Sequence, residues 1–220
     1  MCVFCAFERV GIGIVTLSNY PGACTRGENP IIAKSKLKDE VTDYCNWLGI
    51  ALPADFTLET VQEKISDLDI KDADSDVIFD TERLPFSEKE YFLQKEIALK
   101  SSEDFLKTYN SVKDNNASSL TPRKTFYGFV PRTADEMYIH TKNVNSYYFG
   151  EIGIHADNGG DIVSCRMHGF EEIERRGLIC DGSVYSGQFG EEWSLRKVMR
   201  RFIWHDRIHK KAMLRHCEFR

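Results

Sequence analysis

The stretch from residue 191 to residue 213 limits what this chain can fold into more than any other. Its apolar side chains recur at the i, i+3, i+4 spacing of one helical face, so it predicts a single amphipathic helix. His205 and His209 fall on that apolar stripe, one helical turn apart. Two imidazole groups on an inward face are either hydrogen-bonded core residues or ligands of a metal ion, and we favour the metal.

Composition indicates a soluble globular protein. The 220 residues are 42% hydrophobic and 29% charged, with a formal net charge of −5. Proteins that bind nucleic acid usually carry a basic excess, so this balance argues against that class. No apolar run approaches the ~20 residues of a membrane-spanning helix, and the N-terminus lacks the pattern of a signal peptide. Seven scattered cysteines suit reduced thiols, so we expect a cytoplasmic protein.

The N-terminal third alternates between extended and helical patterns. Its strands are indicated by alternating apolar residues on either side of a glycine break, and its helix by a proline in the first turn. An acidic stretch between the later segments is expected to be a solvated loop. The expected elements are strands at 3–10 and 13–17, a helix from Pro30 to about residue 48, and extended segments at 56–61 and 77–79.

Two patterns in this third have the spacing of metal ligands, but we do not expect either to hold a metal. Cys2 and Cys5 have the spacing of half a zinc site, yet no second cysteine pair follows, and on a strand they point to opposite faces. Asp72, Asp74 and Asp76 alternate as at the start of a calcium-binding loop, but the required glycine and distal glutamate are absent.

The remainder of the chain predicts four amphipathic helices. Ser87 and Thr133 are N-cap residues followed by glutamates in the first turn, and Ser194 caps the last helix. His140 falls on an apolar face of the second helix, so two of the four helices carry histidines that we expect to point inward. The helices are expected at about 88–112, 133–152, 161–176 and 194–213.

These patterns together predict an α+β protein of two domains. A small β-α-β module occupies residues 1–82, and a four-helix bundle occupies residues 83–220. Facing helices of a bundle can build a polar or metal-binding site in the core between them. Dimers are common among such bundles, so a homodimer stays one option, although no motif in the chain encodes it.

The N-terminal module resembles the HicB-like domains. Residues 17–28, with the sequence LSNYPGACTRGE, precede a helix and match the strand, Pro-Gly loop and helix that open those domains. The resemblance covers roughly residues 1–50. HicB-like domains act as antitoxins or occur as appended modules, and we favour the appended module because no helix-turn-helix for DNA binding is present.

The C-terminal domain resembles the DinB-like superfamily of metal-binding four-helix bundles. The resemblance lies in TADEMYIH at residues 133–140 and in the WSLRK…F…H…H pattern that ends at His209. In that family one histidine on the second helix joins an HxxxH pair on the last helix to hold a divalent metal. The resemblance therefore implies His140, His205 and His209 as metal ligands. A long glycine-rich connection at 177–190 departs from the pattern but leaves the ligand positions intact.

Three histidines point to a metal with an open coordination position, as in catalytic rather than structural zinc sites. Zinc or nickel is the expected ion, with iron or manganese as alternatives. Several DinB-like relatives transfer or isomerise low-molecular-weight thiols, so the resemblance implies a metal-dependent thiol S-transferase that acts on a small-molecule substrate. The catalytic residues stay unknown. The alternatives are a non-catalytic protein with a structural metal, in which the HicB-like module contacts a protein partner, and an antitoxin-like regulator.

The neighbours of these histidines contribute less to the expected site. Asp206 follows a ligand directly, but one step along a helix turns it ~100° away. Glu136 lies one turn before His140 and suits a contact to that ring, although its capping-box role explains it equally well. The basic residues of the last helix are expected on a solvated face. The remaining histidines, expected on the surface or in loops, are His155, His168 and His216.

Overall fold

The computed structural model describes residues 1–220 except 1, 10–12, 18, 53–55, 66–76 and 126–127. It is a mostly helical α+β protein that separates into two units, Met1–Leu84 (unit 1) and Pro85–Arg220 (unit 2). The sequence placed the boundary after residue 82. The expected acidic loop and its three alternating aspartates lie outside the described residues. In the described part of the chain, no helix is long and apolar enough to cross a membrane.

Unit 1 contains a four-stranded sheet of the order β3-β2-β1-β4. Strand β1 pairs antiparallel with β2 and parallel with β4, and β2 pairs antiparallel with β3. The predicted hairpin and the predicted extended segment after residue 56 are therefore confirmed. The strands are β1 at Cys2–Arg9, β2 at Gly13–Leu17, β3 at Cys24–Gly27 and β4 at Thr57–Ile65.

The helical part of unit 1 differs from the prediction in one detail. The expected continuous helix is split into α1 at Pro30–Ser35 and α2 at Leu37–Leu48. The hydroxyl of Thr25 donates to the Ala33 carbonyl at 2.8 Å, and the amide of Lys36 donates to the same carbonyl at 3.3 Å. In a continuous α-helix the Ala33 carbonyl would accept from the amide four residues on. Here it accepts from Thr25 and from the amide three residues on, so the chain turns more tightly at the break.

Residues 77–79 were predicted as an extended segment, and Phe79 has extended backbone angles, but the segment forms no strand with the described residues. These three residues are buried but belong to no sheet, and they lead into a short 3-10 helix, η1, at Asp80–Arg83. The backbone amide of Phe79 donates to the Glu82 carboxylate at 2.9 Å. A side-chain acceptor thus replaces the neighbouring strand that a sheet would supply.

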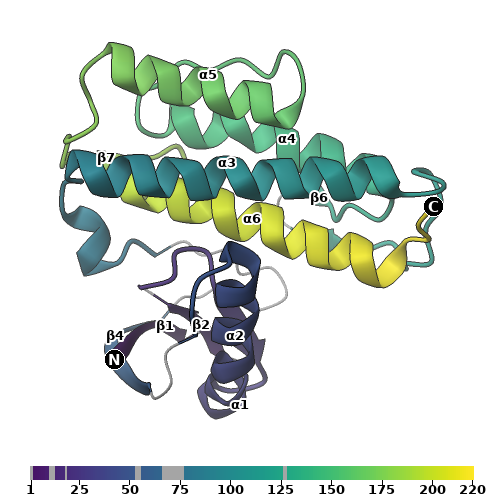
Figure 1. The fold of residues 1–220 in the computed structure, drawn as a ribbon, viewed down its shortest axis with the longest axis horizontal. Coiled ribbons are helices and arrows are strands. Elements are labelled where there is room, and N and C mark those ends of the chain that lie inside the picture. The colour runs from purple at the N-terminus through teal and green to yellow at the C-terminus, as the bar shows by residue number, and fades with distance from the viewer. Residues whose placement is uncertain (1, 10–12, 18, 53–55, 66–76, 126–127) are drawn as a thin grey trace. The chain divides into compact units, whose positions relative to one another are not determined.

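Unit 2 contains the four predicted helices, which pack side by side in Figure 1. Each begins at a side chain that accepts a hydrogen bond from the amide three residues on. The caps predicted at Ser87, Thr133 and Ser194 are confirmed, and Asp161 caps the third helix in the same way. Two short hairpins, β5–β6 and β7–β8, were not predicted. The helices are α3 at Glu88–Ser111, α4 at Ala134–Gly150, α5 at Ile162–Arg175 and α6 at Leu195–His216; the strands are β5 at Lys124–Thr125, β6 at Gly128–Phe129, β7 at Tyr185–Ser186 and β8 at Glu192–Trp193.

Aromatic rings from three helices fill the interior of unit 2. The rings of Phe149 on α4 and Phe170 on α5 meet edge to face at 5.4 Å between centroids. Phe202 on α6 lies 4.9 Å from Phe149 and 6.4 Å from Phe170. Gly169 lets α5 approach this cluster closely, because a Cβ at that position would lie 2.1 Å from the Phe149 ring. This packing holds α4 against α6, the two helices that carry the histidines.

Four basic residues of α6 that were predicted to face solvent are buried instead. Lys197 donates to the Glu192 carbonyl at 2.8 Å and lies over the Trp193 ring. Arg201 lies over the rings of Tyr148 and Trp204 and donates to the Tyr148 hydroxyl at 3.0 Å. These cations are stabilised in the interior by aromatic faces and by oxygen acceptors, which their own charge does not reveal. The four buried residues are Lys197, Arg200, Arg201 and Arg207.

Candidate metal centre

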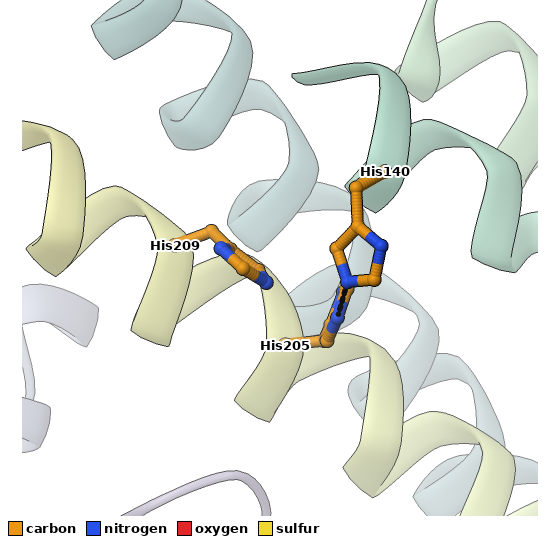
Figure 2. A group of neighbouring side chains, drawn as sticks. All are labelled: His140, His205 and His209. Carbon is orange, nitrogen blue, oxygen red and sulfur yellow. Dashed lines mark hydrogen bonds between the residues drawn. The ribbon is translucent and has the colours of Figure 1, made fainter. Parts of the chain in front are cut away.

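Three histidine rings from two helices of unit 2 converge on one point. His140 projects from α4 toward His205 on α6, and His209 lies one turn further along α6 with its ring turned to the same space (Figure 2). One ring nitrogen of each histidine lies within 4.8 Å of the other two. The Nε2 atoms of His140 and His205 are 3.1 Å apart, and the ring centroids are 4.5 to 5.0 Å apart. The fold thus brings the three predicted residues together.

Burial differs sharply among the three rings. His205 is only 3% exposed, His209 is half-buried and His140 is exposed. The inward position expected for His140 was therefore wrong. The predicted apolar face of α4 is buried at Met137 and Tyr148, but the buried face also includes Thr141 and Asn145, and His140 lies beside it rather than on it. The trio runs from the interior of unit 2 to its surface.

The buried member of the trio is held in its neutral form. Burial is the largest cause that lowers the pKa of His205 well below its ordinary value, and the neighbouring imidazoles of His209 and His140 add to it. The guanidinium groups of Arg201 and Arg166 act in the same direction. Metal binding requires an imidazole without the second proton, so this environment prepares His205 as a ligand at neutral pH.

The arrangement of ring nitrogens fits a transition-metal ion. Two nitrogen ligands of a tetrahedral zinc ion lie about 3.3 Å apart, which follows from the usual zinc–nitrogen bond length. The 3.1 Å between the Nε2 atoms of His140 and His205 is close to that separation. The widest spacing, up to 4.8 Å, needs a side-chain movement of about 1.5 Å to match it. Histidine nitrogen is a ligand that zinc, nickel and iron accept.

The two ring nitrogens of His205 have different surroundings. The Nδ1 atom of His205 is buried and has no hydrogen-bond partner among the described residues. The two nitrogens of a neutral imidazole are one donor and one acceptor, so the described residues satisfy only the Nε2 side of this ring. An ion at Nε2 would leave the N–H of Nδ1 without an acceptor, so the case for a metal rests on the convergence of the three rings.

A buried polar network fixes the rotation of α6 beside the histidines. Arg166 on α5 donates two hydrogen bonds to the Asp206 carboxylate, at 2.8 and 3.1 Å, and both side chains are fully buried. Ser101 on α3 donates to the same carboxylate at 2.6 Å, and Arg166 donates to the Asn145 side chain on α4 at 2.7 Å. All four helices thus contribute. Because Asp206 directly follows His205 on α6, this network holds the His205 ring toward the other two histidines.

This network was not predicted, although the sequence of α5 contains a signal for it. Arg166 lies four residues after Ile162 and four before Phe170, on the buried face of α5. A cation at that position requires an acidic partner in the core. The expectation that Asp206 turns away from its neighbour agrees with its contact to Arg166.

The other candidate residues lie away from the trio. The carboxylate of Glu136 accepts the backbone amides of Arg132 and Thr133 at 2.7 and 3.3 Å, so its role is that of a helix cap. The remaining described histidines are exposed, as predicted, and none joins the cluster. They are His155, His168 and His216.

A cavity of about 560 Å³ lies beside His140. Its volume is within the range of small-molecule sites. Most of its wall is apolar, and Arg132 and Glu136 supply the charged groups. His140 therefore belongs both to the histidine trio and to the cavity wall. The residues that line the cavity are Pro122, Phe129, Val130, Pro131, Arg132, Glu136, Ile139 and His140.

No family model, curated protein or solved structure matches this chain. The resemblance of residues 1–50 to HicB-like domains and that of residues 86–216 to DinB-like bundles therefore stay predictions. The geometry of the three histidines and the cavity beside His140 are the observations from which a function can be proposed.

Proposed function

We propose that this protein binds a divalent transition-metal ion through His140, His205 and His209 and uses it to act on a small molecule. The observation that carries the proposal is the cluster of three ring nitrogens within 4.8 Å of one another. Two helices supply them, and the most buried ring is held neutral. Three neutral imidazoles leave coordination positions for a water or a substrate atom, as in catalytic zinc sites.

The chain's own residues have separable tasks in this proposal. When bound, the ion would supply Lewis acidity and would lower the pKa of a water or thiol that it binds. His205 is held by the interior of unit 2, and Asp206 locks its helix through Arg166. His140 faces the cavity and connects the trio to the space that a substrate would fill. The apolar wall would exclude water from that space.

In its finer form, the proposal is a DinB-like, metal-dependent thiol S-transferase whose cosubstrate is a low-molecular-weight thiol. Support comes from the order of the ligands: one histidine on the second helix of unit 2 and an HxxxH pair on its last helix. Zinc or nickel would be the ion, with iron or manganese as alternatives. The alternative function is a non-catalytic protein in which the metal is structural, and the near-complete burial of His205 favours it.

Metal titration tests the proposal. Cobalt(II) added to chelator-treated protein should give the visible absorption of a low-symmetry, nitrogen-ligated site. His140→Ala should weaken cobalt binding by at least about 100-fold, because loss of an outer-sphere partner alone commonly costs 10–100-fold. His140 is exposed, so its replacement leaves the packing of the core intact. His168→Ala is the matched control, since it also removes an exposed helical histidine.

Equal affinity in His140→Ala and the wild type would refute the proposed ligand set, and so would equal loss in the two variants. Thiol addition separates the catalytic from the structural alternative. A small thiol such as 2-mercaptoethanol should change the cobalt absorption if a coordination position is open. An unchanged spectrum at saturating thiol would favour the structural metal.

A further inference from the structure

We propose that the cavity beside His140 binds a small amphipathic carboxylate, with the anionic group at Arg132 and the apolar part against Phe129 and Ile139. This names the substrate class of the proposed metal site and rests on that function. It assigns Arg132 a binding role that the metal ligands do not supply.

The guanidinium of Arg132 has most of its hydrogen-bonding capacity unused. Among the described residues, its one side-chain hydrogen bond goes from Nη1 to the Leu120 carbonyl at 3.5 Å, the limit of a useful length. No ion pair involves Arg132 within the described residues, although Glu136 lines the same cavity. A planar guanidinium with free N–H groups in a cavity wall suits the bidentate geometry of a carboxylate.

Glu136 does not cancel this preference. Its carboxylate is tied to the backbone amides of Arg132 and Thr133 at the start of α4. These bonds are the main cause that holds its pKa below the ordinary value, and the charge of the Arg132 side chain adds to it without forming an ion pair. The start of a helix carries partial positive charge, which offsets part of this carboxylate. A bound divalent ion at His140 would add further positive charge. The charges around the cavity therefore favour an anion at Arg132, and a loaded metal site would strengthen this preference.

The apolar wall requires a ligand with an apolar part. Phe129 is 78% exposed and Ile139 is 55% exposed, so both leave large apolar surface in water. Pro122, Val130 and Pro131 continue the same surface within the cavity. A carboxylate without an apolar part would leave this surface wet, whereas an aryl or alkyl group would cover it.

Binding of phenylbutyrate to the metal-free protein, followed by residue-resolved amide chemical shifts, tests the anion site without depending on the metal. Phenylbutyrate should shift the amides of Phe129, Ile139 and His140. It should bind more tightly than the uncharged phenylbutyramide and the cationic phenylbutylamine. It should also bind up to about tenfold more tightly than phenylacetate, because two more methylenes leave water.

Arg132→Gln should weaken phenylbutyrate about tenfold or more, since a charge-assisted pair is replaced by neutral bonds. It should leave phenylbutyramide unchanged. Arg175→Gln, which removes an exposed arginine outside the cavity, is the control. Equal affinity for the three probes, an unaffected Arg132→Gln variant, or shifts confined to other residues would each overturn the assignment.

A second readout connects the cavity to the metal. Phenylbutyrate added to the cobalt-loaded protein should change the cobalt absorption, and this change should be lost in Arg132→Gln while cobalt affinity is kept. Carboxylate binding with an unchanged cobalt spectrum would overturn the substrate assignment, because the ligand would not reach the metal. Failure of cobalt to bind at all would instead refute the proposed metal function, and the metal-free titration would still report on the anion site.

Discussion

Replacement of Asp206 by asparagine tests how strongly the buried network supports the histidine helix. The substitution keeps the shape of the side chain and removes its charge. Arg166 is then left as a fully buried cation whose other contacts are neutral: the Asn145 side chain at 2.7 Å, the Ala98 carbonyl at 3.3 Å and the Phe202 ring at 3.9 Å. These groups accept its hydrogen bonds but do not neutralise its charge.

Removal of one partner of a buried ion pair costs about 3–5 kcal/mol. We expect Asp206→Asn to fall in that range, and Arg166→Met to cost a similar amount because it strands the carboxylate. The double variant leaves no uncompensated charge. The double variant should therefore be no less stable than either single variant. Its loss of unfolding free energy should be far smaller than the roughly 6–10 kcal/mol that simple addition of the two costs predicts.

Urea unfolding followed by tryptophan fluorescence measures these differences. Trp193 and Trp204 are buried in unit 2, and a Trp47→Phe background removes the signal from unit 1. Arg175→Gln, which breaks an exposed ion pair with Glu172, should leave the unfolding transition nearly unchanged. Additive losses in the double variant, or a loss below about 1 kcal/mol for Asp206→Asn, would show that the network does not stabilise unit 2 as argued.

Three further outcomes follow from the structure. Gly169→Ala should destabilise the protein by about 1–3 kcal/mol or more, because the new methyl group would overlap the Phe149 ring. Gly150→Ala is the control: its methyl group meets no atom within 4 Å, so the change should be neutral or slightly stabilising. Equal unfolding free energies for the two variants would contradict this packing. Ser194→Ala should cost about 0.5–2 kcal/mol by removing the helix cap, and an unchanged midpoint of thermal unfolding would contradict that role. The metal-free protein should lose up to ~1.4 kcal/mol per pH unit as pH falls below about 6.5, because the unfolded chain then protonates His205 while burial keeps the folded ring neutral; His205→Gln should flatten this slope in a pH series of urea titrations.

The local signals in the sequence were sufficient for the helices of unit 2. A short polar side chain before an apolar repeat can accept a hydrogen bond from the first turn of a helix. The four residues that do so are Ser87, Thr133, Asp161 and Ser194. The apolar stripe of the last helix likewise indicated His205 correctly as buried. These features depend on residues within a few positions of one another.

Features that depend on distant partners were not predictable in the same way. Arg201 is buried against Tyr148 of α4, whereas the pattern of its own helix assigns it to water. On α4, Asn145 is buried and accepts a hydrogen bond from Arg166 of α5, whereas His140 is exposed; the sequence of α4 alone does not show this partner. The break between α1 and α2 similarly depends on the hydroxyl of Thr25, on a separate strand.

Of the two charged residues of the cavity, the role of one was predictable from local sequence and that of the other was not. The sequence identified Glu136 as a capping residue, and the structure places its carboxylate on the expected amide. The cavity itself is formed by the segment before α4 together with the first turns of that helix, and its lining was not predictable from any periodic pattern. Arg132 and His140 line the same cavity only in the folded chain.

Anomalous X-ray diffraction from crystals loaded with zinc or nickel, measured at the absorption edge of the ion, tests the central claim most directly. The account predicts one strong anomalous peak at about 2.0–2.2 Å from ring nitrogens of His140, His205 and His209, with at least one further coordination position that no protein atom fills. A peak held by other residues, or no peak at these three histidines in metal-saturated crystals, would contradict it.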